Sequence, residues 1–510
     1  MTKRDALFLV LLLMSILSAM PGNAAILQDE DSSTVSSQAQ HTDKQDGESK
    51  KHDHHEEGDH HEGHAPAPWS VVPFVLLLSM IATGPLFYPH FWHKSYPIIA
   101  VVLASIVCSY YLFWLKNTHS PIHSAAEYIQ FIALITGLFV ASGGILINVD
   151  KEAKPLTNVV ILAIGAVIAN LIGTTGASML LIRPFIRLNN NRIKPYHVVF
   201  FIFIVSNVGG CLTPIGDPPL FLGFLKGVPF TWTLIHNVVP WAIAVVLLLV
   251  VFYVYDIRNK ADYAKMRGDE EEREPITGKI DLKGRRNFFW LAIVVAAVFL
   301  DPNVFDWVPG IEYDGATFSY LREIIMFAAA LGAIRFSDLQ AIQGNEFSFE
   351  PIREVAFLFI GIFFTMMPAL EMVSTFAQSP QGEKLINPST LYWGTGLLSG
   401  FLDNAPTYVN FLTASMASVG ADISKTQDVV AFASNEYPRS LLDLMAISLG
   451  AVFFGAFTYI GNGPNFMVKS IAEQVGIKMP SFFSYIVRYS VPILLPILFV
   501  IWLLFFQGSH

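Results

Sequence analysis

In each half of this chain, two apolar segments of membrane length are interrupted by glycine, proline and polar side chains. The interruptions are Asn170–Gly176 and Ser206–Pro219 in the first half, and Leu402–Thr407 and Thr458–Asn465 in the second. A helix that breaks at bilayer depth leaves backbone groups without partners, and ionisable side chains there are costly. Bound ions or substrate groups can satisfy them, so paired interruptions in two halves are typical of secondary transporters.

The candidate binding residues are the polar side chains within these interruptions. They are Asn170, Thr174 and Thr175, then Asn207 and Asp217, then Asp403, Asn404 and Thr407, and finally Asn462 and Asn465. Any one Asn or Thr can instead make an ordinary hydrogen bond between helices, without a ligand. Asp403 is the leading candidate, with Asp217 second, because a carboxylate inside the membrane is a functional candidate by default.

A carboxylate at this depth indicates a cation as the ligand. Na⁺ and protons would compete for Asp403, because a bound cation favours the charged form of the carboxylate and a proton replaces it. Neither hairpin tip contains Lys or Arg, which favours a cation over citrate or a dicarboxylate. Helix dipoles alone could still hold an anion beside sodium.

The composition excludes a soluble enzyme. The chain has 510 residues, of which 53% are hydrophobic, and a mean hydropathy of +0.49. Its two cysteines, Cys108 and Cys211, lie far apart in apolar segments, so the sequence offers neither a disulfide framework nor a CxxC metal site. The net charge of −9 says little about partners, because much of the acid lies in one N-terminal segment.

The apolar runs predict an all-α polytopic membrane protein, in which repeats at 70–256 and 288–507 flank a charged loop at 257–287. We expect spans near 70–89, 95–115, 125–148, 156–188, 196–226 and 232–256, and then near 288–304, 321–336, 352–374, 389–419, 440–475 and 483–507. Four of these should be broken, at 170–175, 209–219, 403–406 and 461–464.

Basic residues predict the orientation of the segments. Segment 156–188 has basic residues on both of its flanks, and loop 257–287 is rich in Lys and Arg. Both flanks and the loop should therefore be cytoplasmic. Each arm of 156–188 has about 15 residues and spans about 22 Å, which is less than the ~30 Å hydrocarbon core. It should therefore be a re-entrant hairpin, whereas 389–419, whose flanks are poor in basic residues, should enter from the opposite face. The pattern predicts two inverted-topology repeats, each with a re-entrant hairpin and a broken transmembrane helix.

The N-terminus predicts export of the segment that follows it. Residues 1–25 have the basic, apolar and small-residue regions of a signal peptide, and an uncleaved anchor helix is the alternative. Residues 26–68 are polar and disordered by composition, so we expect an extracytoplasmic segment and a multi-pass protein of the bacterial inner membrane. Weak, peripheral metal capture is chemically feasible for the histidines of this segment, although a solvated tether is favoured. These histidines are His52, His54, His55, His60, His61 and His64.

The string SNVGGCLTPIGDPP at 206–219, followed by LFLGF, resembles the signature of the ion transporter superfamily, which includes citrate transporter-like and arsenite permease-like domains. It is close to NhaD-type sodium/proton antiporters and arsenite-pump permeases, and LDNAPT at 402–407 is similar to the second-hairpin motif of that group. The resemblance covers about 70–507 and implies an inverted-repeat, commonly dimeric transporter with sites at the two hairpin tips. This chain departs from the pattern in two places, because its first tip lacks an aspartate and its second broken span has GNGP in place of GDPP.

The leading hypothesis is a sodium/proton antiporter that works by alternating access, with Na⁺ and H⁺, and in some conditions Li⁺, as ligands. We expect a homodimer in the lipid bilayer, no cofactor and no nucleic-acid partner. A sodium-coupled citrate, dicarboxylate or arsenite-type anion transporter is the alternative, and a metal-handling protein that uses the histidine segment is a third. A membrane enzyme is the weakest option, since the sequence contains no nucleophile–base or HExxH pattern.

Overall fold

A computed structural model describes residues 66–149, 153–189, 192–259, 280–302, 305, 307–313 and 316–508. The expected signal peptide and the histidine segment lie outside these residues. The described chain is an all-α polytopic membrane fold. Nine of its helical segments are long and apolar enough to cross a membrane.

The described helices include short 3₁₀ and π segments, labelled η. In chain order they are η1 (Pro68–Val71), α2 (Val72–Phe87), α3 (Pro89–Ser109), η2 (Tyr110–Trp114), α4 (His119–Gly143), α5 (Pro155–Leu188), α6 (Pro195–Ile204), η3 (Val208–Leu212), α7 (Pro218–Lys226), α8 (Trp232–Arg258), α10 (Arg286–Val298), α11 (Leu321–Arg335), α12 (Leu339–Gly344), α13 (Glu350–Ala377), α14 (Pro380–Leu385), α15 (Pro388–Phe401), α16 (Asn404–Ser418), α17 (Thr426–Ala433), α18 (Ser440–Phe454), η5 (Gly455–Phe457), α19 (Gly463–Gln474), α20 (Phe482–Tyr485), η6 (Ile486–Leu494) and α21 (Leu495–Phe505).

All four expected interruptions are present. Helix α5 breaks at Gly173, whose φ of 79° is a left-handed conformation that favours glycine. The second hairpin breaks between α15 and α16. The two other breaks begin a few residues earlier than expected, because α6 ends at Ile204 and α18 passes into η5 at Gly455. Proline in the first two positions of α7 and α19 restarts each helix, since its missing N–H costs nothing there.

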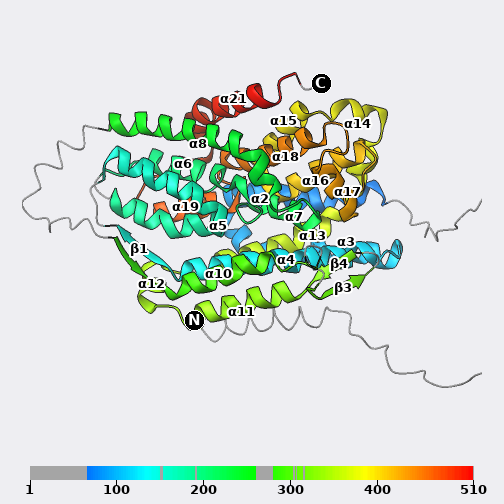
Figure 1. The fold of residues 1–510 in the computed structure, drawn as a ribbon, viewed down its shortest axis with the longest axis horizontal. Helices are drawn as coiled ribbons and strands as arrows, with labels where there is room; N and C mark the ends of the chain where they lie inside the picture. Colours follow the sequence, from blue (N-terminus) through cyan, green and yellow to red (C-terminus); the bar gives the residue numbers. More distant parts are fainter. Residues whose placement is uncertain are drawn as a thin grey trace, which may run out of the picture. The chain divides into compact units, whose positions relative to one another are not determined.

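The bases of the two hairpins lie at opposite ends of α8, a helix of 27 residues and so about 40 Å long (Figure 1). The first turn of α5 is hydrogen-bonded to Asp256, near the C-terminus of α8. In contrast, Trp232 in the first turn of α8 donates to the carbonyl of Ala433 in α17, close to the start of α18. The hairpins thus approach each other from opposite ends of α8. Their entry from opposite faces of the membrane, and the inverted relation of the two repeats, stay predictions.

The halves interlock through their breaks. Helix α7 from the first half packs against α16 of the second hairpin, and α19 from the second half packs against α5. On the other side of the molecule, α4 packs against α10, α11 and α13. Each hairpin tip is therefore enclosed by elements from both halves.

Two small antiparallel sheets were not predicted from the sequence. Strands β1 (Leu146–Val149) and β2 (Ile280–Lys283) pair with Leu146 opposite Lys283, so the end of α4 is joined to the end of the loop between the halves. Strands β3 (Gly310–Tyr313) and β4 (Ala316–Ser319) form a local hairpin. Four-residue strands give too short an alternation of apolar and polar residues to be recognised beside long apolar helices.

Candidate functional site

The same hydrogen bond holds each break against a hairpin tip. Thr213 Oγ1 donates to the carbonyl of Asn170 at 2.6 Å, and Thr458 Oγ1 donates to the carbonyl of Gly400 at 2.6 Å. In both cases the accepting carbonyl belongs to the last turn before the tip, where helix carbonyls lack intrahelical partners. Each break thus contains one threonine that fastens it to a hairpin tip in the same way.

Asp217 lies where the two hairpin tips meet. Its side chain is 1% exposed and accepts hydrogen bonds from three neutral groups on three other segments. Oδ1 accepts from Thr174 Oγ1 at 2.7 Å and from Asn462 Nδ2 at 2.9 Å. Oδ2 accepts from Asn404 Nδ2 at 2.7 Å. Because the donors come from the first tip, the second tip and the second break, this one carboxylate connects four segments and both halves.

Three asparagines connect the two breaks beside Asp217. Asn207 Nδ2 donates to Asn465 Oδ1 at 2.7 Å, and Asn462 Nδ2 lies 3.2 Å from Asn207 Oδ1. Asn465 donates in turn to the carbonyls of Gly455 and Thr458 in its own break. All three side chains are buried, so these bonds satisfy polar groups that water does not reach.

Asn170 has a positioning role in the structure. Its Nδ2 donates to the carbonyls of Ala166 and Gly209, and its Oδ1 accepts from the backbone N–H of Leu212 at 2.8 Å. These contacts fasten the first tip to the first break, since the amide bridges two backbone segments. Because the oxygen and nitrogen of its side-chain amide already form these hydrogen bonds, Asn170 is less available to bind a ligand than its neighbours are.

The other predicted residues lie at the edge of this cluster. Asp403 is partly exposed and caps α16, with Oδ1 accepting from the backbone N–H of Ala405 at 3.0 Å. Thr407 donates to the carbonyl of Asp403, as helical threonines commonly do. Thr175 lines a neighbouring cavity. The carboxylate at the centre is therefore Asp217, which comes from the first break, whereas Asp403 from the second tip stands beside it.

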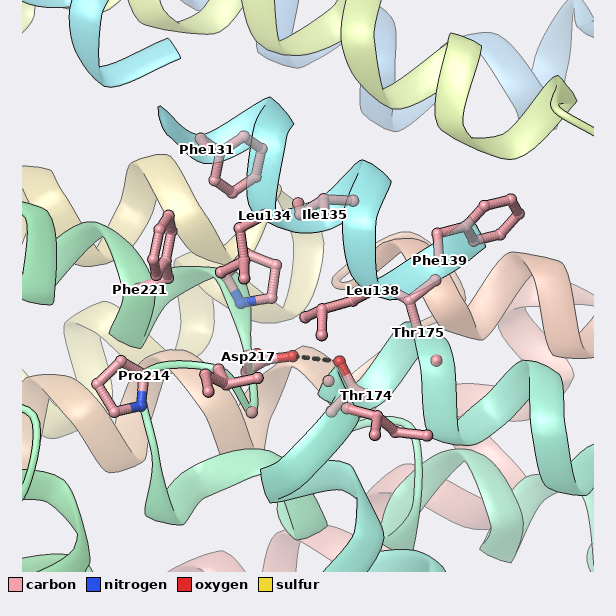
Figure 2. A pocket seen from close by; sticks show the side chains of 16 residues that line it. Phe131, Leu134, Ile135, Leu138, Phe139, Thr174, Thr175, Pro214, Asp217 and Phe221 are labelled. Carbon is pink, nitrogen blue, oxygen red and sulfur yellow. Dashed lines mark hydrogen bonds between the residues drawn. The ribbon is translucent and has the colours of Figure 1, made fainter. Parts of the chain in front are cut away.

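A small cavity of about 40 Å³ lies against Asp217, Thr174 and Thr175 (Figure 2). Apolar side chains of α4, including Leu134 and Leu138, form its opposite wall. One water molecule takes up about 30 Å³ in the liquid, whereas pockets for larger organic ligands occupy about 300–1,000 Å³. In this conformation the cavity has room for an ion or a water molecule beside the carboxylate.

Helix N-termini surround the carboxylate. Asp217 is the N-cap of α7, Asp403 that of α16 and Asn462 that of α19, and the second arm of α5 begins directly after Gly173. The positive ends of four helix dipoles therefore meet here, and they favour negative charge. Among the described residues, no Lys or Arg side chain pairs with Asp217 or Asp403.

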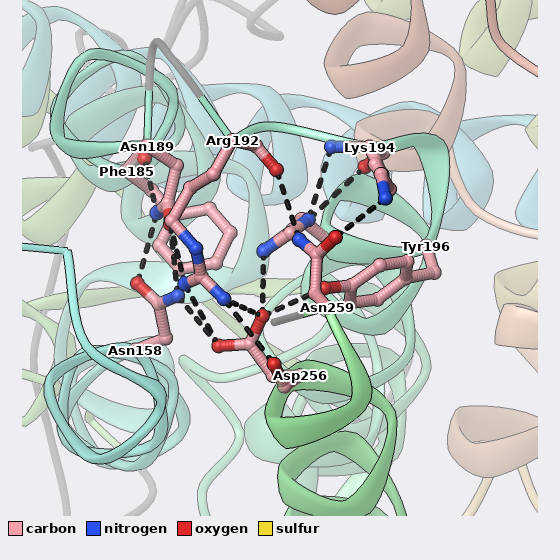
Figure 3. Close-up of polar contacts among 9 residues, drawn as sticks. Asn158, Phe185, Asn189, Arg192, Lys194, Tyr196, Asp256 and Asn259 are labelled. Carbon is pink, nitrogen blue, oxygen red and sulfur yellow. Dashed lines mark hydrogen bonds and ion pairs between the residues drawn. The ribbon is translucent and has the colours of Figure 1, made fainter. Parts of the chain in front are cut away.

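Sequence reasoning missed a second buried carboxylate, at the base of the first hairpin. Asp256 Oδ1 accepts from Arg192 at 2.6 Å and from Tyr196 at 2.6 Å, and His197 Nε2 lies 3.0 Å from the same oxygen (Figure 3). Oδ2 accepts from Asn158 at 3.0 Å and from Arg192 at 3.1 Å. The signal in the sequence was an acidic residue at the end of an apolar span. It was not recognised because the partners of Asp256 come from three segments that are distant in the sequence.

The comparison with protein families agrees with this architecture. A family described as "Putative citrate transport" matches residues 63–506. The chain belongs to this family. The match confirms the resemblance at the level of a citrate transporter-like domain of the ion transporter superfamily, and it makes the chain a transporter-family protein. The narrower NhaD-type assignment stays a prediction. Comparison with curated proteins gave no match.

Proposed function

We propose that this membrane protein is a secondary transporter that exchanges Na⁺ for H⁺ by alternating access, with Asp217 as the residue that binds both ions. The buried position of Asp217, and its three neutral donors from both halves, carry the proposal. A buried carboxylate without a basic partner is costly in its charged form unless a cation neutralises it. Either Na⁺ or a proton supplies that neutralisation, so binding of one excludes the other.

The donors around Asp217 suit this alternation. In the structure Asn404 and Asn462 present N–H groups to the carboxylate. Each side-chain amide also has an oxygen, so rotation about its last bond would present an oxygen ligand to Na⁺. The hydroxyl of Thr174 can likewise turn a lone pair to a cation. Asp403, at the start of α16, would be a second acidic group near the ion.

The test is exchange in everted membrane vesicles with an imposed pH gradient, measured as Na⁺-induced dequenching of a pH-sensitive dye. We expect Asp217→Asn to abolish exchange and Asp403→Asn to weaken apparent Na⁺ affinity. Glu436→Gln, an exposed position, serves as the matched control and should behave as wild type. Full activity of Asp217→Asn would disprove the assignment of Asp217, and absence of dequenching in the wild type would disprove antiport.

A sodium-coupled citrate or dicarboxylate transporter is the second candidate function, with an arsenite-type anion as a variant. The family description and the four converging helix N-termini favour it, because helix N-termini bind anions without basic side chains. In this conformation the cavity of about 40 Å³ is smaller than pockets that hold organic ligands, which disfavours this alternative. Uptake of labelled citrate or succinate that requires Na⁺, with no Na⁺/H⁺ exchange, would select this alternative.

We also infer the cellular setting from the charge pattern. The C-terminal end of α8 would face the cytoplasm of a bacterial inner membrane, and the histidine segment would be extracytoplasmic. Homodimer formation and Li⁺ as an alternative ligand belong to the same proposal. Labelling of single cysteines with a membrane-impermeant reagent would test the orientation.

A further inference from the structure

A third buried carboxylate, Asp443, lies in the first turn of α18, at the base of the second hairpin. Its side chain is 2% exposed. Ser415 Oγ of α16 donates to Oδ2 at 3.1 Å, whereas Oδ1 is buried and has no hydrogen-bond partner among the described residues. Such an oxygen has to be satisfied by a proton, a cation or water, because a charged carboxylate is an acceptor only.

The charged surroundings of Asp443 are sparse. Arg439, the residue before α18, is exposed, and among the described residues neither it nor any other basic side chain forms an ion pair with Asp443. The elements packed against α18, which include α15, α16 and α17, contribute the Ser415 hydroxyl alone as a hydrogen-bond donor to this carboxylate. An intramembrane carboxylate with so little support is a functional candidate by default.

A line of polar side chains on α16 leads from Asp443 to the central site. At 100° per residue, Asn404, Tyr408 and Ser415 lie within about 40° of one another on the helix surface, over about 16 Å of its length. Two of them bond to a carboxylate on another element, since Asn404 donates to Asp217 and Ser415 donates to Asp443. Tyr408 lies between these two positions on the helix.

Tyr408 is also close to α7, the short helix that begins at Asp217. A Cβ atom added to Gly223 would lie 2.4 Å from the Tyr408 hydroxyl oxygen, so α7 and α16 approach closely at this point. The polar line is thus enclosed between α7, α16 and α18.

We propose that Asp443 is a proton-binding residue that relays protons between the solution at the N-terminal end of α8 and Asp217. The carboxylate takes a proton from a water molecule at its free oxygen Oδ1 and passes it to another water molecule on the side of Asp217, which restores the carboxylate. The polar side chains of α16 line this path and carry no proton themselves. No other bond forms or breaks. The proposal rests on Na⁺/H⁺ exchange at Asp217 and assigns a route for the proton.

Proteoliposomes that contain the full-length chain test the proposal. We expect Asp443→Asn to lower the maximal exchange rate by about tenfold or more, since the loss of a positioned proton-transfer group has large rate effects. Apparent Na⁺ affinity should stay within twofold of wild type, because Asp443 does not contact the central cluster. Asp443→Glu should recover much of the rate, and Glu436→Gln is the matched exposed control from the preceding segment.

A second readout does not depend on exchange. A hydrophobic carbodiimide reacts with protonated carboxyl groups in apolar surroundings, and peptide mass spectrometry locates the adduct. We expect labelling of Asp443 in the wild type that falls as pH rises, whether or not Asp443→Asn folds. Absence of this adduct at every pH would overturn the proposal.

The outcomes separate the two proposals. No exchange in the wild type with pH-dependent labelling of Asp443 defeats the antiport function and leaves Asp443 as a proton-binding group. Wild-type exchange with an unchanged rate in folded Asp443→Asn defeats the relay alone. A loss of Na⁺ affinity in Asp443→Asn as large as in Asp217→Asn also defeats it, because that result would place Asp443 in the ion site.

Discussion

The bases of the two hairpins each contain a buried aspartate, but these aspartates have very different partners. Asp256, at the base of α5, accepts hydrogen bonds on both oxygens, including two from the guanidinium of Arg192. Asp443, at the base of the α15–α16 hairpin, accepts one bond of 3.1 Å and leaves an oxygen unpartnered among the described residues. A buried carboxylate whose two oxygens are both hydrogen-bonded holds its partner segments in place. A carboxylate oxygen without a partner can still accept a proton, a cation or water.

The first hairpin is also closed at its base. Asn158 lies in the first turn of α5, and Asn189 directly follows the last residue of this helix. The two side chains donate hydrogen bonds to each other, at 2.9 and 2.8 Å. Both arms of α5 are thereby joined to the end of α8 through Asp256.

The start of the second hairpin is held by neutral hydrogen bonds, in which Ser389 donates to the carbonyl of Phe506 and accepts from Trp502. Among the described residues this base contains no buried ion pair like that of Arg192 and Asp256, so we infer that the second hairpin is the more mobile of the two.

The largest expected effect is a loss of thermal stability when the base of the first hairpin is changed. Asp256→Asn leaves the buried Arg192 without its counter-charge, which costs about 3–5 kcal/mol for a buried pair. Asp443→Asn should cost less than about 1 kcal/mol, since it breaks no ion pair. Thermal unfolding of the purified proteins in detergent measures both, and equal losses would contradict the contrast between the bases.

The next effect is at the first hairpin tip. Thr174→Val keeps the shape of the side chain but removes the hydroxyl bonded to Asp217, at a cost of about 1.5–3 kcal/mol for a bond to a charged group. Apparent Na⁺ affinity should fall about tenfold or more in the exchange assay. Thr413→Val is the control, because this buried threonine bonds only to the carbonyl of Val409 in its own helix, and apparent Na⁺ affinity should stay within twofold. Similar losses in the two variants would mean that the hydrogen bond to Asp217 is not what matters.

A smaller effect separates backbone strain from function. Gly173 and Gly420 have nearly the same φ, 79° and 78°, which other residues rarely adopt, so alanine at either position should cost about 1–3 kcal/mol. Gly173 forms the first tip, while Gly420 follows the second hairpin with open space around it. We expect comparable losses of thermal stability in both variants but loss of exchange only in Gly173→Ala. Loss of exchange in Gly420→Ala as well would show that strain alone impairs transport.

The smallest effect compares the matched threonines. Thr213→Val and Thr458→Val each remove one hydrogen bond between a break and a tip, worth about 1 kcal/mol. Thr458→Val should slow exchange more, because among the described residues the base of the second hairpin lacks a buried ion pair such as Arg192–Asp256 to keep the tip in place. A larger effect of Thr213→Val would reverse our inference about which hairpin moves.

The sequence was sufficient to predict the helical membrane fold and the four interruptions. Long apolar runs and the spacing of Gly and Pro are local signals, and the break at Gly173 fell within the expected 170–175. It was also sufficient to predict a cluster, since Asn207, Asp217, Asn404 and Asn462 all meet.

The ranking of the two aspartates could not be read from the sequence. Asp217 and Asp403 both stand directly before a helix, so their local patterns are alike. Their surroundings differ because Asp217 receives donors from residues as distant as Asn404 and Asn462, whereas Asp403 bonds within its own turn. Long-range partners also explain why Asp256 and Asp443 were missed.

The β1–β2 ladder has a mechanical consequence for the whole transporter. It fastens the end of α4 in the first half, by backbone hydrogen bonds over four residue pairs, to the end of the loop that leads into the second half. The other pair of strands, β3 and β4, lies within the second half and fastens it only to itself. If the halves rotate against each other, the ladder is the natural pivot, and points far from it travel the greater distance.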